Sequence, residues 1–299
     1  MSATVTRASR SRGQVLFWSM RRELWENRFL LVVPALAAAL LPLAFLVIAV
    51  MVLRGRADVT GSFHVDSGTW LTSCTRPAIA AAILAGIVYG LGALHNEARD
   101  RSLLFWKSMP VSDAMAVAAK MLVIILVLPL FAMICAAVAC LLLIMFSMLL
   151  GGRPGLALAH LPGEAVFQTG ATLLLFLWMF PLWGWLLLVS AAARRSPFLW
   201  AFGLPLAVIV LEYMTFGTGH AARLVLGHFR PILPFMAGNL EIVTHGTSVG
   251  LSGMPFRVNA AALASGAYGI SAPGLWIGLG AGLLMTGGAV EIRRRQTLL

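Results

Sequence analysis

The stretch FLLVVPALAAALLPLAFLVIAVMVL, residues 29–53, contains no charged side chain and lies between Arg28 and Arg54. A helix rises 1.5 Å per residue, so about 20 apolar residues are enough to cross the hydrocarbon core of a bilayer. The stretch is long enough to do so with some residues to spare. It therefore predicts a membrane-spanning helix.

The composition of the whole chain agrees with this interpretation. Of the 299 residues, 60% are hydrophobic and 11% are charged, whereas soluble domains are about 45–50% apolar and about 25% charged. A soluble enzyme, a secreted domain and a disordered chain are thereby excluded. The net charge of +11 does not indicate nucleic-acid binding, because the basic residues form short clusters between apolar runs. Three cysteines are too few for a disulfide framework.

Charge-poor runs divide the chain into an all-α, polytopic transmembrane domain over residues 29–299. Six transmembrane helices are predicted at about residues 29–53, 77–95, 121–150, 170–193, 197–216 and 273–290. Between the last two spans lies an apolar segment, residues 217–272, which is too poor in charge for a solvated loop of its length. We expect it to contain short helices against the outer leaflet, with a disordered loop as the alternative.

The distribution of basic residues predicts the orientation. With the N-terminus inside, 15 of the 22 lysine and arginine residues fall in cytoplasmic segments. Cytoplasmic loops carry an excess of these residues. Both termini are therefore predicted to be cytoplasmic, which agrees with an even number of spans.

Residues 1–28 form a cytoplasmic N-terminus that ends in an amphipathic stretch. Ser19, Arg22, Glu23 and Glu26 share one side of a helical wheel, and apolar residues flanked by Trp18 and Trp25 lie opposite. This pattern favours a helix lying in the inner membrane interface. The alternative is a simple extension of the first span.

Small residues recur at every fourth position of the second span. They are Ala78, Ala82, Gly86 and Gly90. Such a stripe lets another helix approach closely, either within the chain or across a dimer.

The most informative segment is EARDRSLLFWKSMPVSD, residues 97–113, within the predicted cytoplasmic segment 96–113. Four consecutive apolar residues, 103–106, follow alternating charges. They dip into the membrane interface or fill a pocket on a partner protein, because an aromatic anchor rimmed by charges is typical of binding hot spots. Ser112 or Asp113 is the predicted N-cap of the next helix.

This segment resembles membrane subunits of the ABC type-2 exporter family, in which a near-identical E-x-R-D-R-S-hydrophobic-hydrophobic-F-W-K-S-hydrophobic-P-V-S-D run follows the second span. The resemblance implies a coupling helix that docks on a separate ATP-hydrolysing subunit. It also implies two copies of that subunit, a second membrane subunit, outer re-entrant helices and a bacterial cytoplasmic (inner) membrane. By position, the docking residues are Glu97, Arg99, Asp100, Arg101, Ser102, Phe105, Trp106 and Lys107.

The residues themselves exclude an ATP site of the P-loop type. Such a loop needs G-x-x-x-x-G-K-[ST], and the only lysines, Lys107 and Lys120, follow Trp106 and Ala119. We therefore expect no cofactor and no enzymatic activity in this chain, with ATP and magnesium bound by the partner.

Other chemistry finds little support. The six histidines lie outside the centres of the spans, and no metal site or catalytic group is predicted. Glu212 is the one acid within a predicted span. It is either an interfacial acid that ends the fifth span or a charge that lines a transport pathway.

The predicted function is the permease subunit of an ATP-driven exporter. The alternative is a secondary transporter, or a non-catalytic membrane protein, that works without an ATPase. Peptide, antibiotic, lipid and polysaccharide cargo all remain open, as does pairing with an identical or a different membrane subunit.

Overall fold

A computed structural model describes residues 12–54, 67–99, 112–149, 155–229, 240–245, 248–253 and 270–295. In these ranges the elements are helices apart from one short hairpin, so the helical class is confirmed. Five of the helices described are long and apolar enough to cross a bilayer, and the total is six if a bent pair counts as one more span. The expectation of a multi-pass membrane protein is thereby supported.

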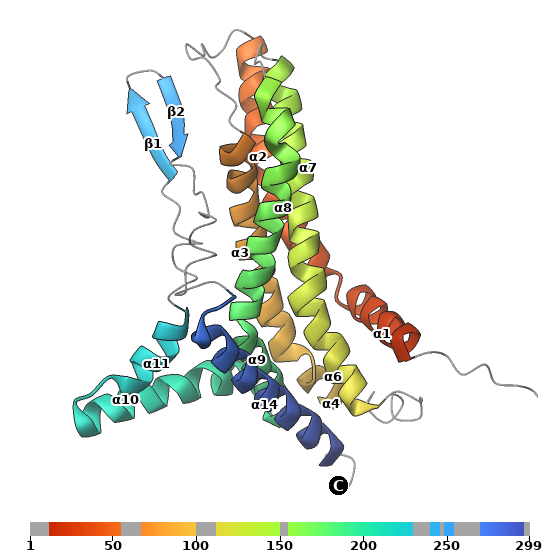
Figure 1. Cartoon of the computed structure of the whole chain (residues 1–299), viewed down its shortest axis with the longest axis vertical. Helices are drawn as coiled ribbons and strands as arrows, with labels where there is room; N and C mark the ends of the chain where they lie inside the picture. The colour runs from red at the N-terminus through yellow and green to blue at the C-terminus, as the bar shows by residue number, and fades with distance from the viewer. Residues whose placement is uncertain are drawn as a thin grey trace, which may run out of the picture.

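Four long helices run side by side along the molecule (Figure 1). They are α2 (Phe29–Leu53), α3 (Ser67–Gly92), α7 (Leu128–Leu149) and α8 (Gly155–Trp178). The bounds of α2 are those that the sequence predicted. Both α3 and α8 begin earlier than the predicted spans, and Pro77 and Pro162 lie inside them without ending them.

The third predicted span is one continuous helical segment with a π-helical turn. It begins as α6 (Asp113–Leu122), passes through η1 (Val123–Val127) and continues as α7. A second π-helical turn, η2 (Leu199–Gly203), lies later in the chain. The two turns end two residues before Pro129 and Pro205, respectively. Since a proline lacks an N–H and clashes with the carbonyl four residues earlier, a local shift of the hydrogen-bond register accommodates it.

The predicted fourth span, residues 170–193, is bent rather than straight. α8 ends at Trp178 and α9 (Phe180–Ala192) continues at an angle of 47°. Pro181 lies at the start of α9, where a proline is tolerated. The indole N–H of Trp183 donates to the Phe176 carbonyl at 3.2 Å, which satisfies an acceptor close to the break.

The sixth predicted span is α14 (Pro273–Arg295), which begins where the sequence predicted. Its contact with α9 is the most extensive between any two helices of the part described. A Cβ atom added to Gly184 would lie 2.6 Å from the Gly282 carbonyl oxygen, and one added to Gly282 would lie 2.9 Å from the Phe180 carbonyl oxygen. The two backbones therefore touch at a crossing that only glycine permits, which we call the glycine crossing (Gly184 and Gly282).

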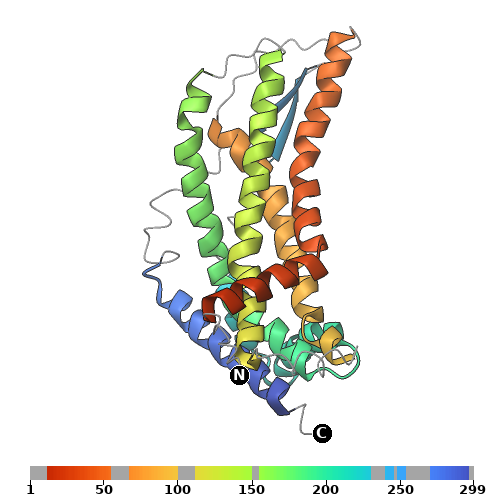
Figure 2. The ribbon, with the colours of Figure 1, turned by 90° about the vertical axis from the view of Figure 1, so that its right-hand side faces the viewer.

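The helix of the predicted fifth span, α10 (Leu204–Phe216), runs crosswise to the four long helices (Figures 1 and 2). It has no buried residue and contacts mainly η2 and the following helix, α11 (His220–Phe229). Because little of the described part of the chain packs against it, its apolar surface is open there to lipid or another helix. That α10 crosses the membrane stays a prediction.

Within the predicted outer segment 217–272 the structure describes two features. One is α11, and the other is an antiparallel hairpin of β1 (Leu240–His245) and β2 (Ser248–Gly253) that the sequence did not predict. Residues 230–239 and 254–269, where further short helices were expected, lie outside the described residues. The re-entrant arrangement stays a prediction.

Much of the core lies between α3, α7, α8 and α9. The Trp183 side chain is fully buried, and its ring stacks on that of Phe176 with 5.8 Å between centroids. Gly86 of α3 makes room for this indole, since a Cβ there would lie 3.2 Å from it. The bend at Met179 thus directs α9 and its indole into the bundle.

Candidate functional site

Alternating charges join five helices at one end of the bundle, where α1 (Arg12–Glu26), α3, α4 (His95–Arg99), α6 and α14 meet. We call this group the charge chain. Its members, in the order in which they touch, are Asp113, Arg293, Glu97, Lys120, Glu23 and Tyr89. Each link pairs opposite charges, except the last, where a phenol donates to a carboxylate.

Arg293, in the last turn of α14, binds two carboxylates at once. Its Nη1 donates to Glu97 Oε2 at 2.7 Å and its Nε donates to Asp113 Oδ1 at 3.0 Å. Arginine suits this position because its planar guanidinium carries several donors in a rigid fork. The buried Arg293 side chain therefore ties α14 to α4 and to the first turn of α6.

Lys120 is the most deeply buried charge of the group, with 1% of its surface exposed. Its Nζ lies 2.8 Å from Oε1 of Glu97 and 2.8 Å from Oε1 of Glu23. A buried charge is costly unless it is paired, and here two carboxylates compensate one ammonium. The ammonium also lies 5.9 Å from the ring centroid of Tyr89.

Glu23 connects α1 to the bundle. Its Oε1 accepts from Lys120 and from Arg22 Nη2 at 3.0 Å, and its Oε2 accepts from the Tyr89 hydroxyl at 2.8 Å. The sequence placed Glu23 on the polar side of an amphipathic helix, and the structure turns this side toward α3 and α6. The reason is that buried donors on these helices need a carboxylate partner.

The opposite side of α1 is exposed and aromatic. Phe17, Trp18 and Trp25 expose more than half of their surface, and the guanidinium of Arg21 lies over both indole rings at 5.1 and 5.6 Å. This arrangement fits an interfacial helix, although that location stays a prediction. At the edge of the same helix, burial raises the pKa of the Glu26 carboxyl above its ordinary value, and the guanidinium of Arg22 opposes this shift.

Uncharged hydrogen bonds fasten α4 from its other side. The Ser190 hydroxyl of α9 donates to the Leu91 carbonyl at 2.8 Å and accepts from the backbone N–H groups of Leu94 and His95, both at 3.0 Å. The ring nitrogen Nδ1 of His95 lies 2.8 Å from the Ala193 carbonyl oxygen. α4 is thus held by α9 as well as by α14.

Of the predicted docking residues, the structure describes Glu97 and Arg99. Glu97 is largely buried and its carboxylate is engaged within the chain, whereas Arg99 at the end of α4 is exposed. The remaining ones lie outside the described residues: Asp100, Arg101, Ser102, Phe105, Trp106 and Lys107. Ser112 is the N-cap of α6, as one of the two predicted alternatives had it, because its hydroxyl accepts from the Met115 N–H at 3.3 Å.

The small-residue stripe packs within the chain. Ala78, Ala82, Gly86 and Gly90 are buried. A Cβ on Gly90 would lie 3.2 Å from that of Leu186, and the Gly86 site faces Trp183. Of the two interpretations of the stripe, contact between helices of one chain is therefore what the structure displays at both glycines.

Glu212, the acid assigned to a pathway, caps a helix. Its carboxylate accepts from the backbone N–H groups of His220 and Ala221 at 2.6 and 2.7 Å and from the Thr218 hydroxyl at 2.9 Å. These donors lie at the start of α11, where N–H groups lack partners within the helix. A pathway role for Glu212 stays a prediction.

Sequence reasoning did not assign a site role to Glu23, Lys120, Arg293 or Ser190. The only signals were that Lys120 and Arg293 stand at the ends of apolar runs and that Glu23 lies on the polar side of the amphipathic stretch. Such positions are common for charges that merely flank a span. The sequence therefore does not indicate that these residues contact one another.

Among the described residues, no group of three or more His, Cys, Asp and Glu side chains is arranged to hold a metal ion. Each carboxylate of the charge chain contacts a cationic side chain within 3.0 Å. Such mutual pairing suits side chains that link helices to one another. Proton transfer or metal binding by these carboxylates would have to compete with the ion pairs.

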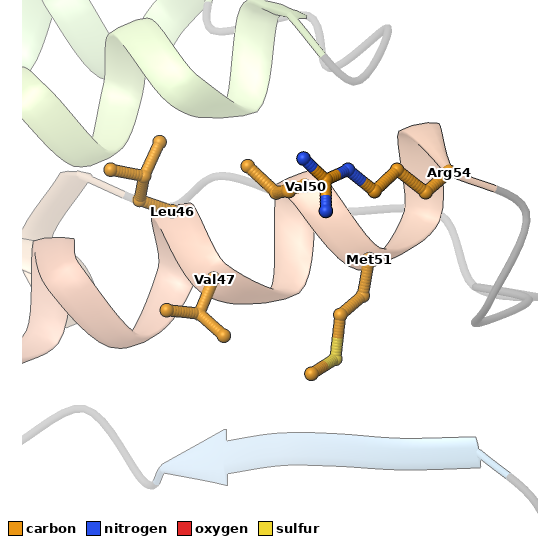
Figure 3. A pocket seen from close by; sticks show the side chains of 5 residues that line it. All are labelled: Leu46, Val47, Val50, Met51 and Arg54. Carbon is orange, nitrogen blue, oxygen red and sulfur yellow. The ribbon is translucent and has the colours of Figure 1, made fainter.

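A shallow groove of about 290 Å³ lies at the other end of α2, far from α1 (Figure 3). Figure 3 shows its lining, which is four apolar side chains and one guanidinium: Leu46, Val47, Val50, Met51 and Arg54. An apolar surface that ends on an arginine is typical of a helix facing lipid. We assign no function to this groove.

Comparisons of the chain with protein-family models, with curated proteins and with solved structures give no significant match.

Proposed function

We propose that this chain is the membrane-spanning subunit of an ATP-driven transporter of the exporter type, and that a separate subunit hydrolyses the ATP. The charge chain is the observation that carries the proposal. It fastens both borders of residues 100–111, α4 on one side and α6 on the other, to the end of α14.

The physical reasoning starts from what a coupling element must do. A segment that receives force from a partner has to be attached stiffly to the helices that it moves, because a flexible joint would absorb the displacement. Paired, buried charges resist separation strongly, since pulling one away leaves the other uncompensated in a medium of low dielectric. The borders of residues 100–111 have such attachments on α14 and α1, and uncharged hydrogen bonds add one on α9.

Three features of the sequence support the same function. The run at residues 97–113 resembles the coupling segment of ABC type-2 exporters, the chain lacks a P-loop, and an aromatic pair stands within the run. The composition leaves few charges for an ion pathway. This favours amphiphilic cargo moved by an external motor.

The test is reconstitution of the chain in lipid nanodiscs with the product of an adjacent ATPase gene as the candidate partner. We expect the two to co-purify and the chain to stimulate ATP hydrolysis. Trp106→Ala should abolish the stimulation while the chain still inserts, and Trp200→Ala, which truncates an exposed indole on η2, is the matched control. Unchanged stimulation by the Trp106→Ala chain would contradict docking through this segment, and cargo movement by the chain alone would favour a secondary transporter.

A further inference from the structure

Arg293 has a position that no feature of the sequence indicates. It lies 196 residues from Glu97 and 180 residues from Asp113 in the chain, yet binds both with one guanidinium. These two acids stand on α4 and on the first turn of α6. Arg293 therefore connects both of these helices to α14.

The helix that carries Arg293 is joined to α9 along its length. The glycine crossing brings the backbones of α9 and α14 into direct contact. A contact between backbones is stiff because it has no side-chain rotamers through which to relax. A displacement of the end of α14 is therefore passed to α9 and not absorbed between them.

The other attachments of α4 also connect it to α9 and α14. Ser190 ties the start of α4 to α9, and Glu97 ties its middle to α14 through Arg293. Hence α4 holds both members of one helix pair, α9 and α14, whereas α2 has no extensive contact with either of them among the described residues.

We infer that Arg293 is the positioning residue that makes α9 and α14 move as one body with α4 and α6, relative to α2. This inference rests on the proposed function, in which an ATPase displaces the segment between α4 and α6. The guanidinium acts by joining two carboxylates. Losing one of the two ion pairs of Arg293 should weaken the coupled motion of these helices, and losing both should abolish it.

The experiment measures a distance in the complete transporter with its ATPase. Spin labels replace Leu40 on α2 and Ile277 on α14, both of which are exposed, in a chain whose cysteines Cys74, Cys135 and Cys140 are changed to alanine. Pulsed dipolar spectroscopy then compares the complex without nucleotide and with a non-hydrolysable ATP analogue. In the chain with native Arg293 we expect the nucleotide to shift the distance.

Arg293→Gln should remove this shift while the complex still forms. Asp113→Asn, which leaves the pair with Glu97 in place, should keep part of it, as should Arg293→Lys, which retains the charge without the fork. The control is Arg295→Gln, which removes an exposed guanidinium two residues away and should leave the shift intact.

The outcomes separate the two levels of the proposal. A full shift in Arg293→Gln overturns the role of Arg293 and leaves the proposed function standing. The absence of any shift in the chain with native Arg293, or the failure of the ATPase to bind it, contradicts the proposed function itself. Should Arg293→Gln not fold, the partial response of Asp113→Asn decides, because a shift equal to that with native Asp113 overturns the inference.

Discussion

Two regions hold α14 in place by opposite means. At its C-terminal end, Arg293 enters the charge chain and binds carboxylates at 2.7 and 3.0 Å. In its middle, the backbone of Gly282 lies directly against Gly184 of α9. The first attachment is electrostatic and directional, and the second is steric and free of charge.

The difference teaches how the two attachments respond to change. A buried ion pair resists separation of its two charges, and it fails when one charge is lost. A backbone crossing has no room for an added side chain, because even a methyl group must displace main-chain atoms. The charge chain therefore depends on keeping every charge, and the glycine crossing depends on the absence of side-chain atoms.

The largest effect is expected from breaking the charge chain at Lys120. Lys120→Ala leaves the carboxylates of Glu23 and Glu97 facing each other without the ammonium between them. Removing one partner of a buried pair costs about 3–5 kcal/mol. Unfolding in mixed micelles, followed by tryptophan fluorescence, should report a loss of this size.

The control for Lys120→Ala is Arg295→Gln at the same end of the bundle. Its pair with Glu291 is exposed, and exposed pairs of this spacing contribute about 0.3–0.5 kcal/mol. Similar losses in the two variants would contradict the buried, compensating role of the charge chain.

A smaller effect, of the opposite chemical kind, is expected at the glycine crossing. Gly184→Ala places a methyl group 2.6 Å from the Gly282 carbonyl oxygen, and overpacking of this kind costs about 1–3 kcal/mol. Gly280→Ala is the same substitution on α14 at a site where the added Cβ meets nothing within 4 Å. It should stabilise the helix by up to about 1 kcal/mol. Opposite signs in the unfolding free energies of the two variants confirm the crossing, and a stabilising Gly184→Ala refutes it.

The smallest effect is expected at the uncharged attachment of α4. Ser190→Ala removes the acceptor of two backbone N–H groups, those of Leu94 and His95, at a cost of about 1–2 kcal/mol. Hydrogen exchange at these two amides should accelerate. Thr169→Val, whose hydroxyl donates to the Ala165 carbonyl of its own helix, serves as comparison and should leave both amides protected.

Local signals predicted the helices well. The bounds of α2, the start of α14 and the cap at Ser112 follow from the length of apolar runs and from the chemistry of one hydroxyl. The bend at Met179 was missed, although Pro181 lies next to it. A proline in a membrane helix is compatible with a straight or a bent path, and the packing of Trp183 against Phe176 accompanies the bend.

The candidate site was predicted only in its location. The segment at 97–113 was singled out, and Glu97 was assigned to a partner, whereas the structure engages its carboxylate with Lys120 and Arg293. The three side chains belong to separate helices. Which charges form pairs depends on how these helices pack against one another, and the periodicity of one helix does not predict that packing.

The sequence by itself determined that this chain is a bundle of apolar helices, because burying its apolar surface anywhere but in lipid and between helices is physically excluded. It also determined that charges would gather at the ends of those helices. Only the tertiary structure decided that Arg293 faces Glu97 and Asp113, and that Gly184 faces Gly282. The physical reason is range: hydrophobic length and capping act within a few residues, whereas ion pairs and close crossings depend on atoms that only the folded chain brings together.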